Sequence, residues 1–289
     1  MSPTRTDPDL ESSGGQTTTD PYPLVERELS LLLSLRQDAY SRAGSSASPR
    51  AAIVYAPGTS STIKLLYGMA FRAPNTYELY YQDAASKFLP GKDIQPEHIH
   101  DLELVLGNRL GKHLDINLTG FVMKIDHLID QVFSPADSTT SFENAHGDYA
   151  RGCEGELIGN YSTGVGWYLR YTYEYATSQQ SGGVLTNAPL HLGRMGSRVR
   201  ILPYLHFSVE AMAESGRLTV NGTTTDPLVV ANANVTYAPS EIALRVQLGV
   251  RNLFNAPYAY PGGFEHIQND IMQDGRTWWM TLSYAIPVQ

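Results

Sequence analysis

The chain alternates apolar and polar side chains with a period of two, which sends them to opposite faces of a β-strand. Residues 241–251 show the alternation most clearly. The apolar positions there are Ile242, Leu244, Val246, Leu248 and Val250. The positions between them include Arg245 and Arg251, whose charges need water or carboxylates on their face. The segment therefore predicts a strand with one apolar and one polar face.

The same alternation recurs and predicts about twelve antiparallel strands, so the fold class is all-β. The expected strands lie near residues 31–40, 49–56, 61–71, 98–107, 112–126, 149–160, 164–176, 190–201, 203–214, 229–238, 241–253 and 277–286. Most are about ten residues long, as a tilted crossing of a bilayer requires, whereas soluble sandwich strands usually have about five or six. Their length indicates a membrane β-barrel.

The connections between these strands alternate between tight turns and long loops. The turns lie near residues 57–60, 107–109, 162–164, 202–203 and 239–240. The loops lie near residues 72–97, 127–148, 177–189, 215–228 and 254–276. Short turns on one rim and long loops on the other are typical of outer-membrane barrels. A soluble β-sandwich also mixes loop lengths and is the less favoured alternative.

The composition supports membrane-spanning β-strands and argues against one class of binding partner. Of 289 residues, 42% are hydrophobic and only 17% charged, yet no apolar run reaches the roughly 18 residues of a membrane helix. Tyrosine, with 18 residues against 8 Phe and 3 Trp, suits the boundary between lipid and water. The net charge of −8 and the lack of Lys/Arg runs argue against a nucleic-acid partner.

The first residues differ from the rest. Residues 1–22 are rich in Ser, Thr, Asp, Gly and Pro and contain no signal peptide, because an apolar core is lacking. We expect a disordered polar segment over residues 1–30 and a barrel segment over residues 31–289. Cys153 is the single cysteine and cannot form an internal disulfide.

One segment resembles the barrel of TonB-dependent outer-membrane receptors: Lys64-Leu65-Leu66-Tyr67-Gly68-Met69-Ala70-Phe71-Arg72-Ala73-Pro74-Asn75-Thr76-Tyr77-Glu78-Leu79-Tyr80. Further motifs of that family follow in order: Ile94-Gln95-Pro96-Glu97, Leu102-Glu103-Leu104, Asn187-Ala188-Pro189-Leu190-His191, Val250-Arg251-Asn252-Leu253-Phe254-Asn255 with Tyr258, and Gln273-Asp274-Gly275-Arg276-Thr277. Pro74 ends a strand because it lacks a ladder donor, so we interpret these motifs mainly as barrel architecture.

The resemblance implies the C-terminal half of a barrel of about 22 strands, without the N-terminal plug and the TonB-engaging segment. It implies location in the outer membrane, contact with outer-membrane lipid, and uptake of a scarce nutrient such as a siderophore–iron complex or a cobalamin. TonB is then a partner only if a plug segment is supplied elsewhere. Two alternatives stay open: a non-transporting receptor fragment, and a self-closing passive outer-membrane pore.

No enzyme activity is expected, because neither a nucleophile turn nor a Gly-rich phosphate loop occurs. No cofactor or metal site is expected, although His98 and His100 share a strand face. We expect Asp93, Glu97 and Asp101 to form a solvated acidic loop. The candidate ligand-binding residues lie in the long loops and at the barrel mouth. They are Arg72, Asn75, Tyr77, Tyr80, Tyr81, Tyr258 and Tyr260.

Overall fold

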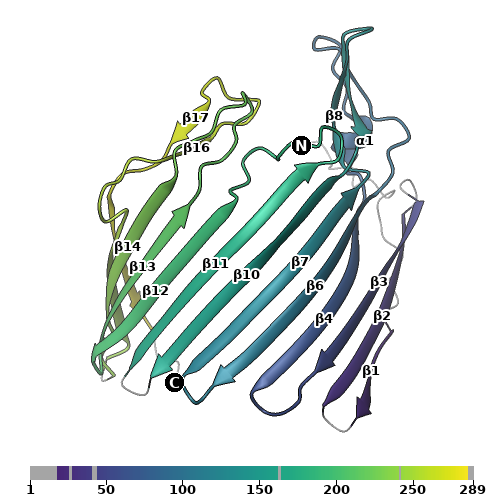
Figure 1. Ribbon diagram of the computed structural model, residues 1–289. Helices are drawn as coiled ribbons and strands as arrows, with labels where there is room; N and C mark the ends of the chain where they lie inside the picture. The colour runs from purple at the N-terminus through teal and green to yellow at the C-terminus, as the bar shows by residue number, and fades with distance from the viewer. Residues whose placement is uncertain (1–17, 26–27, 41–43, 162–163, 241, 286–289) are drawn as a thin grey trace. The chain divides into compact units, whose positions relative to one another are not determined.

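A computed structural model describes residues 18–25, 28–40, 44–161, 164–240 and 242–285. Thirteen strands form one sheet, in the order β1-β2-β3-β4-β6-β7-β10-β11-β12-β13-β14-β15-β18 (Figure 1). Two small sheets, β5-β9-β8 and β16-β17, lie in the connections. No helix among the described residues is both long and apolar enough to cross a membrane.

The strands of the large sheet are β1 (Thr18–Val25), β2 (Leu29–Tyr40), β3 (Gly44–Tyr55), β4 (Ser61–Arg72), β6 (Glu97–Leu110), β7 (Leu114–Asp126), β10 (Asp148–Tyr161), β11 (Val165–Ser178), β12 (His191–Leu202), β13 (Leu205–Glu214), β14 (Leu228–Tyr237), β15 (Leu244–Arg251) and β18 (Thr277–Tyr284). All twelve expected strands are confirmed, with their ends shifted by a few residues. β1 is additional and lies within residues 1–30, for which we expected disorder. Residues 1–17 of that segment lie outside the described residues.

The chain divides into two compact units, which we describe separately. Unit 1 contains Met1–Val105, Phe121–Arg151 and Ala176–Gly183. Unit 2 contains Leu106–Gly120, Gly152–Tyr175 and Val184–Gln289.

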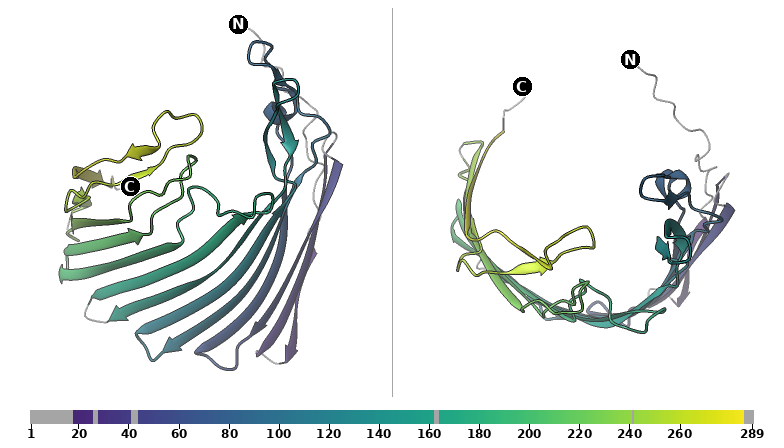
Figure 2. Two further views of the ribbon diagram at one scale, coloured as in Figure 1. Left: turned by 45° about the horizontal axis from the view of Figure 1, so that its top comes forward. Right: turned by 90° about the horizontal axis from the view of Figure 1, so that it is seen from above.

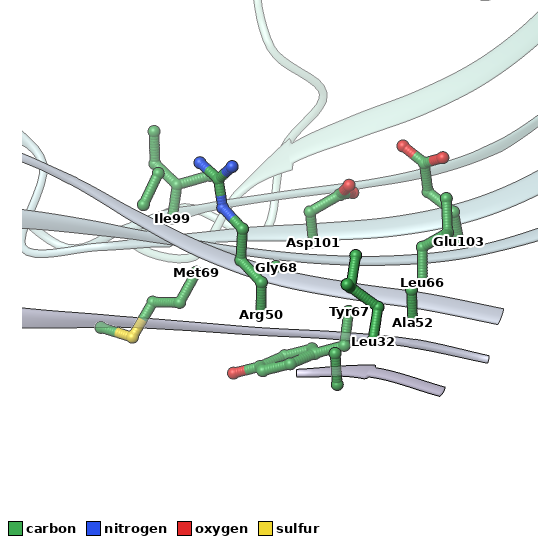
Figure 3. Close-up of a pocket in the computed structure, with 12 residues that line it drawn as sticks. Leu32, Arg50, Ala52, Leu66, Tyr67, Gly68, Met69, Ile99, Asp101 and Glu103 are labelled. Atoms are coloured by element: carbon green, nitrogen blue, oxygen red, sulfur yellow. The ribbon is translucent and has the colours of Figure 1, made fainter. Parts of the chain in front are cut away.

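In unit 1 the period of two separates an apolar face from a polar face. Leu102 and Leu104 on β6 are each 45% exposed, so no protein layer covers them. Figure 3 shows Arg50, Asp101 and Glu103 extending to one side of the strands, and Tyr67 and Met69 to the other. A pocket of about 380 Å³ lies along these strands rather than in the loops. An uncovered row of leucines is what a membrane-facing wall requires.

The packed apolar cluster of unit 1 lies in its loops. The small sheet of β5 (Phe88–Leu89), β8 (Ile129–Ser134) and β9 (Thr139–Asn144) lies near the short helix α1 (Thr76–Tyr80). Ile94, Ile129 and Phe142 are buried together, and Leu79 and Phe88 pack against them. These strands lie within the ranges 72–97 and 127–148, which we predicted as long loops.

Unit 2 has the same two faces. Leu248 on β15 is paired with Val235 on β14 and Met280 on β18. Leu248 is 53% exposed and Met280 is 67% exposed, so this apolar face is also uncovered. On the other face Gln247 donates to the Thr236 hydroxyl over 3.2 Å.

Two glycines of unit 2 lie under aromatic rings from the neighbouring strand. Gly249 is paired with Trp279, and Gly196 with Tyr168. A Cβ on Gly249 would lie 2.3 Å from the Trp279 ring, and one on Gly196 would lie 2.5 Å from the Tyr168 ring. The aromatic side chain therefore fills the space that the glycine leaves, as in other sheets with strand glycines.

The last connection of unit 2 contains the hairpin of β16 (Ala259–Pro261) and β17 (Asp270–Met272), drawn in yellow in Figure 2. Phe264 and Ile267 between the two strands are 90% and 100% exposed. Apolar side chains at the end of a long polar loop are available for contact with another molecule.

Candidate ligand-binding loops

Arg72, the last residue of β4, joins two carboxylates. Its Nε and Nη2 each donate to the Glu97 carboxylate over 2.7 Å, and Nη1 donates to both Glu78 oxygens over 2.8 and 3.0 Å. The Glu78 and Glu97 side chains are 9% and 7% exposed, against 41% for Arg72. Bidentate guanidinium–carboxylate pairs are the strongest hydrogen bonds between side chains. Arg72 therefore holds the base of its loop.

Asn75 begins α1. Its Oδ1 accepts from the Glu78 backbone N–H over 2.9 Å, and Glu78 Oε2 accepts from the Asn75 backbone N–H over 2.8 Å. This reciprocal capping box fixes the first turn of the helix. Pro74, which is fully buried, ends β4 immediately before it. The Phe-Arg-Ala-Pro-Asn motif thus ends a strand and starts a helix.

Glu97 and Asn144 connect the two loops of unit 1. Glu97 Oε1 accepts from the Ile129 backbone N–H over 2.8 Å. Asn144 donates to the carbonyls of Gln95 and His127 over 2.9 and 2.7 Å, and it accepts from the Gln95 N–H over 2.7 Å. Our expectation of a solvated Glu97 is wrong, because the residue is only 5% exposed and Arg72 neutralises it.

The three tyrosines of α1 and its C-terminal end are exposed, by 52% for Tyr77, 46% for Tyr80 and 36% for Tyr81. The Tyr77 and Tyr81 rings stack at 4.4 Å. Tyr77 also meets Phe142 edge-on at 5.6 Å, and Tyr81 meets Phe88 edge-on at 5.1 Å. One side of each ring thus packs on the loop core while the side chain stays accessible.

The neighbouring Tyr77 phenol raises the pKa of Tyr81 above its ordinary value, and loss of water acts in the same direction. The Tyr81 hydroxyl is therefore neutral at physiological pH and can donate a hydrogen bond.

In unit 2 the side chain of Arg217 links three of the long loops between strands. Its Nη2 donates to Glu214 Oε2 over 2.6 Å, and Nη1 donates to Asn187 Oδ1 over 2.8 Å. The guanidinium lies 4.6 Å from the centre of the Tyr260 ring. Burial raises the pKa of the Tyr260 phenol, and the nearby Glu214 carboxylate adds to the effect. The Arg217 side chain is 19% exposed and that of Glu214 is 3% exposed, so this cluster is largely buried.

Tyr258 and Tyr260 pack edge-on at 5.8 Å and are both half-buried. The seven predicted residues therefore divide into two groups: Arg72 to Tyr81 in unit 1, and Tyr258 and Tyr260 in unit 2. Within the first group, the structure brings the predicted residues together on one helix and its flanks. Arg72 and Asn75 use their polar groups in the loop itself, which leaves the tyrosines as the more accessible candidates. Ligand contact by any of the seven stays a prediction.

Asn252 explains the Asn-Leu-Phe motif. It is 2% exposed and has a φ of 49°, which asparagine tolerates better than most residues. Its side chain accepts from the Ala256 N–H and donates to the Ala256 carbonyl, both over 2.8 Å. Asn252 therefore shapes the start of the last long loop.

Sequence reasoning missed Arg217, Phe88 and Phe142, because each contacts a residue distant in the sequence. It also missed Glu214, although its partner Arg217 is only three residues away. Phe264 and Ile267 were also missed, although isolated apolar residues in a polar loop beside Gly262 and Gly263 are a usable signal. In the part of the chain that the structure describes, no group of three or more His, Cys, Asp or Glu side chains is arranged to hold a metal ion.

The polar face of unit 2 carries further charged groups. Arg170 Nε donates to Glu156 Oε1 over 2.6 Å, and Asn117 donates to Glu156 Oε2 over 3.1 Å. Together with Arg194 they line a pocket of about 350 Å³. This face can hold hydrogen-bonding groups of a polar ligand or of another protein segment.

Comparison with known proteins identifies the family. Residues 5–253 match the family described as TonB dependent receptor-like, beta-barrel. The fold is similar to the ferric enterobactin receptor of Pseudomonas aeruginosa, with a TM-score of 0.79 and 20% identity over 91% of this chain. It is also similar to the siderophore receptor PirA of Acinetobacter baumannii, with a TM-score of 0.74 and 19% identity over 90% of this chain.

The copper transporter OprC gives a TM-score of 0.72 and 16% identity over 91% of this chain. The chain spans 43%, 44% and 46% of the lengths of these three structures, so it matches less than half of each. Comparison with curated proteins finds no match. Family and neighbours are receptors and transporters rather than enzymes. Because the match covers most of the sequence, the chain belongs to the TonB-dependent receptor family and represents part of its outer-membrane β-barrel.

Proposed function

We propose that the chain forms part of the wall and the capture loops of an outer-membrane receptor that takes up a scarce nutrient, such as a siderophore–iron complex or a cobalamin. The observation that carries the proposal is the group of exposed tyrosines on α1, fixed at the loop base by Arg72. Tyrosine provides a large, rigid contact at low cost in side-chain entropy. Catecholates and corrins offer flat faces for such rings. The names of two similar structures, an enterobactin receptor and a siderophore receptor, support this class of ligand.

The remaining parts of the proposal concern partners. Outer-membrane lipid contacts the apolar face of the strands, which no protein layer covers. TonB acts on such a receptor through a plug segment, and we propose that role for a part of the receptor other than the strands and loops described.

The test is a binding titration of the full chain in phosphatidylcholine vesicles, with tryptophan fluorescence as the readout. The ligands are a ferric catecholate, a cobalamin and a ferric hydroxamate, which lacks an aromatic face. The double variant Tyr77→Ala/Tyr81→Ala removes two stacking rings. We expect it to bind whichever flat ligand the wild type binds, the ferric catecholate or the cobalamin, about tenfold more weakly than the wild type does, since stacking contributes about 0.5–1.5 kcal/mol per ring pair.

Phe133→Ala is the matched control, because Phe133 is a 60% exposed aromatic residue on β8 of the same unit. Its loss should leave affinity unchanged. Equal affinity of the double variant and the wild type for all three ligands would contradict the assignment of this loop.

A further inference from the structure

The apolar face contains two tyrosine–histidine pairs of the same construction. In unit 1 the Tyr67 hydroxyl lies 3.0 Å from His100 Nδ1, with the rings at 6.4 Å and 29°. In unit 2 the Tyr171 hydroxyl lies 2.7 Å from His191 Nδ1, with the rings at 6.1 Å and 24°. In both cases two neighbouring strands supply one ring each. The repetition points to a shared role.

Both histidines lie at the long-loop end of the apolar row on their own strand. His100 precedes Leu102 and Leu104 on the same face of β6, and it is the fourth residue of that strand. His191 is the first residue of β12 and shares its face with Met195, which is 57% exposed. Figure 3 shows Tyr67 on the side of the strands opposite the charged residues Arg50 and Asp101. Each histidine is therefore placed where lipid tails give way to headgroups.

The hydrogen bond determines what each histidine offers to its surroundings. When the tyrosine hydroxyl donates to Nδ1, a neutral imidazole carries its proton on Nε2. Nε2–H is then a donor with no described protein acceptor. Headgroups of phospholipids offer phosphate and ester oxygens, which are acceptors. A donor at this depth fits the phosphate, because charge-assisted hydrogen bonds are the stronger ones.

A lysine lies at the same end of the neighbouring strand β7 and marks the headgroup level on this face. Lys124 lies at the long-loop end of β7 and shares its face with Leu118 and Val122. Lys124 is 48% exposed and forms an ion pair of 2.7 Å with Asp126. A lysine at the end of an apolar row extends its ammonium group toward the headgroups.

From this geometry we infer that Tyr67–His100 and Tyr171–His191 are binding sites for the phosphate of lipid headgroups, with His100 Nε2 and His191 Nε2 as donors. The inference rests on the outer-membrane location of the proposed function. It adds a specific polar contact to a wall that otherwise meets lipid through apolar side chains.

The test uses the full chain, with histidine nitrogens labelled by ¹⁵N, in vesicles of phosphatidylcholine and phosphatidylglycerol. Solid-state NMR measures dephasing of each Nε2 signal by lipid ³¹P, and His100→Gln and His191→Gln assign the signals. We expect dephasing at His100 and His191. His206, on the polar face of β13, is the internal control and should show none. Tyr67→Phe should weaken the ³¹P contact of His100 and shift its tautomer ratio, with His191 unchanged.

The same samples report contacts between the methyl groups of Leu102 and Leu104 and the lipid acyl chains. Leucine contacts without ³¹P dephasing at either histidine would overturn the phosphate sites and leave the membrane wall intact. Contact of Nε2 with ester carbonyls instead of phosphorus would also overturn them. Absence of both leucine and phosphorus contacts would overturn the membrane location together with the inference.

Discussion

Replacing Val246 by Arg tests whether the apolar face of β15 meets lipid. Val246 is paired with Tyr237 and Leu282, so it lies within the apolar face of three strands. The aliphatic row of β15 runs from Leu244 to Val250 and extends over about 20 Å of strand at roughly 3.4 Å per residue. With a tilt of about 40° it covers roughly 16 Å of an apolar band about 25 Å high.

Val246 is an inner position of that row. With the row centred in the band, Val246 is about 10 Å in height from the nearer boundary, whereas an arginine side chain reaches only about 7 Å. The guanidinium therefore stays within hydrocarbon. Arginine near the midplane of such barrels costs about 2–4 kcal/mol, so we expect the unfolding equilibrium to shift by roughly 30- to 1,000-fold.

The control is Gln247→Arg, one residue away on the opposite face. It loses the hydrogen bond to Thr236, which contributes about 0.5–1.5 kcal/mol, while the new charge remains hydrated. The assay is urea unfolding of the full chain in phosphatidylcholine vesicles, followed by tryptophan fluorescence, with protease protection of the inserted fraction as a second readout. On a water-exposed surface Val246→Arg would stay within about 0.5 kcal/mol of the wild type, and Gln247→Arg would show only the loss of its hydrogen bond. Equal effects at the two positions would refute the membrane-facing assignment.

Three further predictions concern stability. Gly249→Ala should destabilise by about 1–3 kcal/mol, because its Cβ would overlap the Trp279 ring. Gly68→Ala, with nothing within 4 Å, should be close to neutral in the same urea titration. Asn252→Ala should cost about 2–4 kcal/mol locally, through lost hydrogen bonds and a strained φ. Faster proteolysis within residues 253–276 is the measurement, and an unchanged rate would contradict the anchoring role. The pKa of Asp83 is lowered by hydrogen bonds from the Ser86 hydroxyl and from the backbone N–H groups of Ala85 and Ser86. Because this pKa is depressed, the stabilisation is present at neutral pH and is lost only as the pH falls through the lowered folded pKa. The protection factor of the Ser86 amide against hydrogen exchange should then fall on acidification in the wild type, and Asp83→Asn should remove this dependence.

The large sheet could be predicted because the sequence patterns that specify its strands are local. A period of two over about ten residues is repeated in each strand, and the turn residues between strands are adjacent in sequence. The motifs that resemble the TonB-dependent receptors could also be interpreted from the sequence as features that end strands and shape loops. Pro74 ends β4, Asn75 caps α1 and Asn252 shapes the last loop, and each acts within a few residues of its own position.

The loops were harder because their contacts are distant in sequence. Arg72 and Glu97 are 25 residues apart, and Arg217 and Asn187 are 30 residues apart, with no periodicity to connect them. The β8–β9 hairpin left a signal that we did not use, since Pro135 and Asp137 mark a turn between two short alternating segments. To predict that this hairpin supports Tyr77 and Tyr81, one would have to know that Phe142 packs against Phe88, at 5.4 Å between ring centres.

The hydrogen bonds of Arg72, Glu97 and Asn144 act at the base of the loops, and the turn at residues 135–138 takes no part in them. Peptides inserted at this turn would therefore leave the strand ends and α1 in place. The hairpin is a natural position for an inserted epitope or an affinity tag. By the same reasoning, a loop exchanged between related receptors should fold when Arg72 and Glu97 come from the same receptor. It should fail to fold when the exchange takes one of these two residues from each receptor.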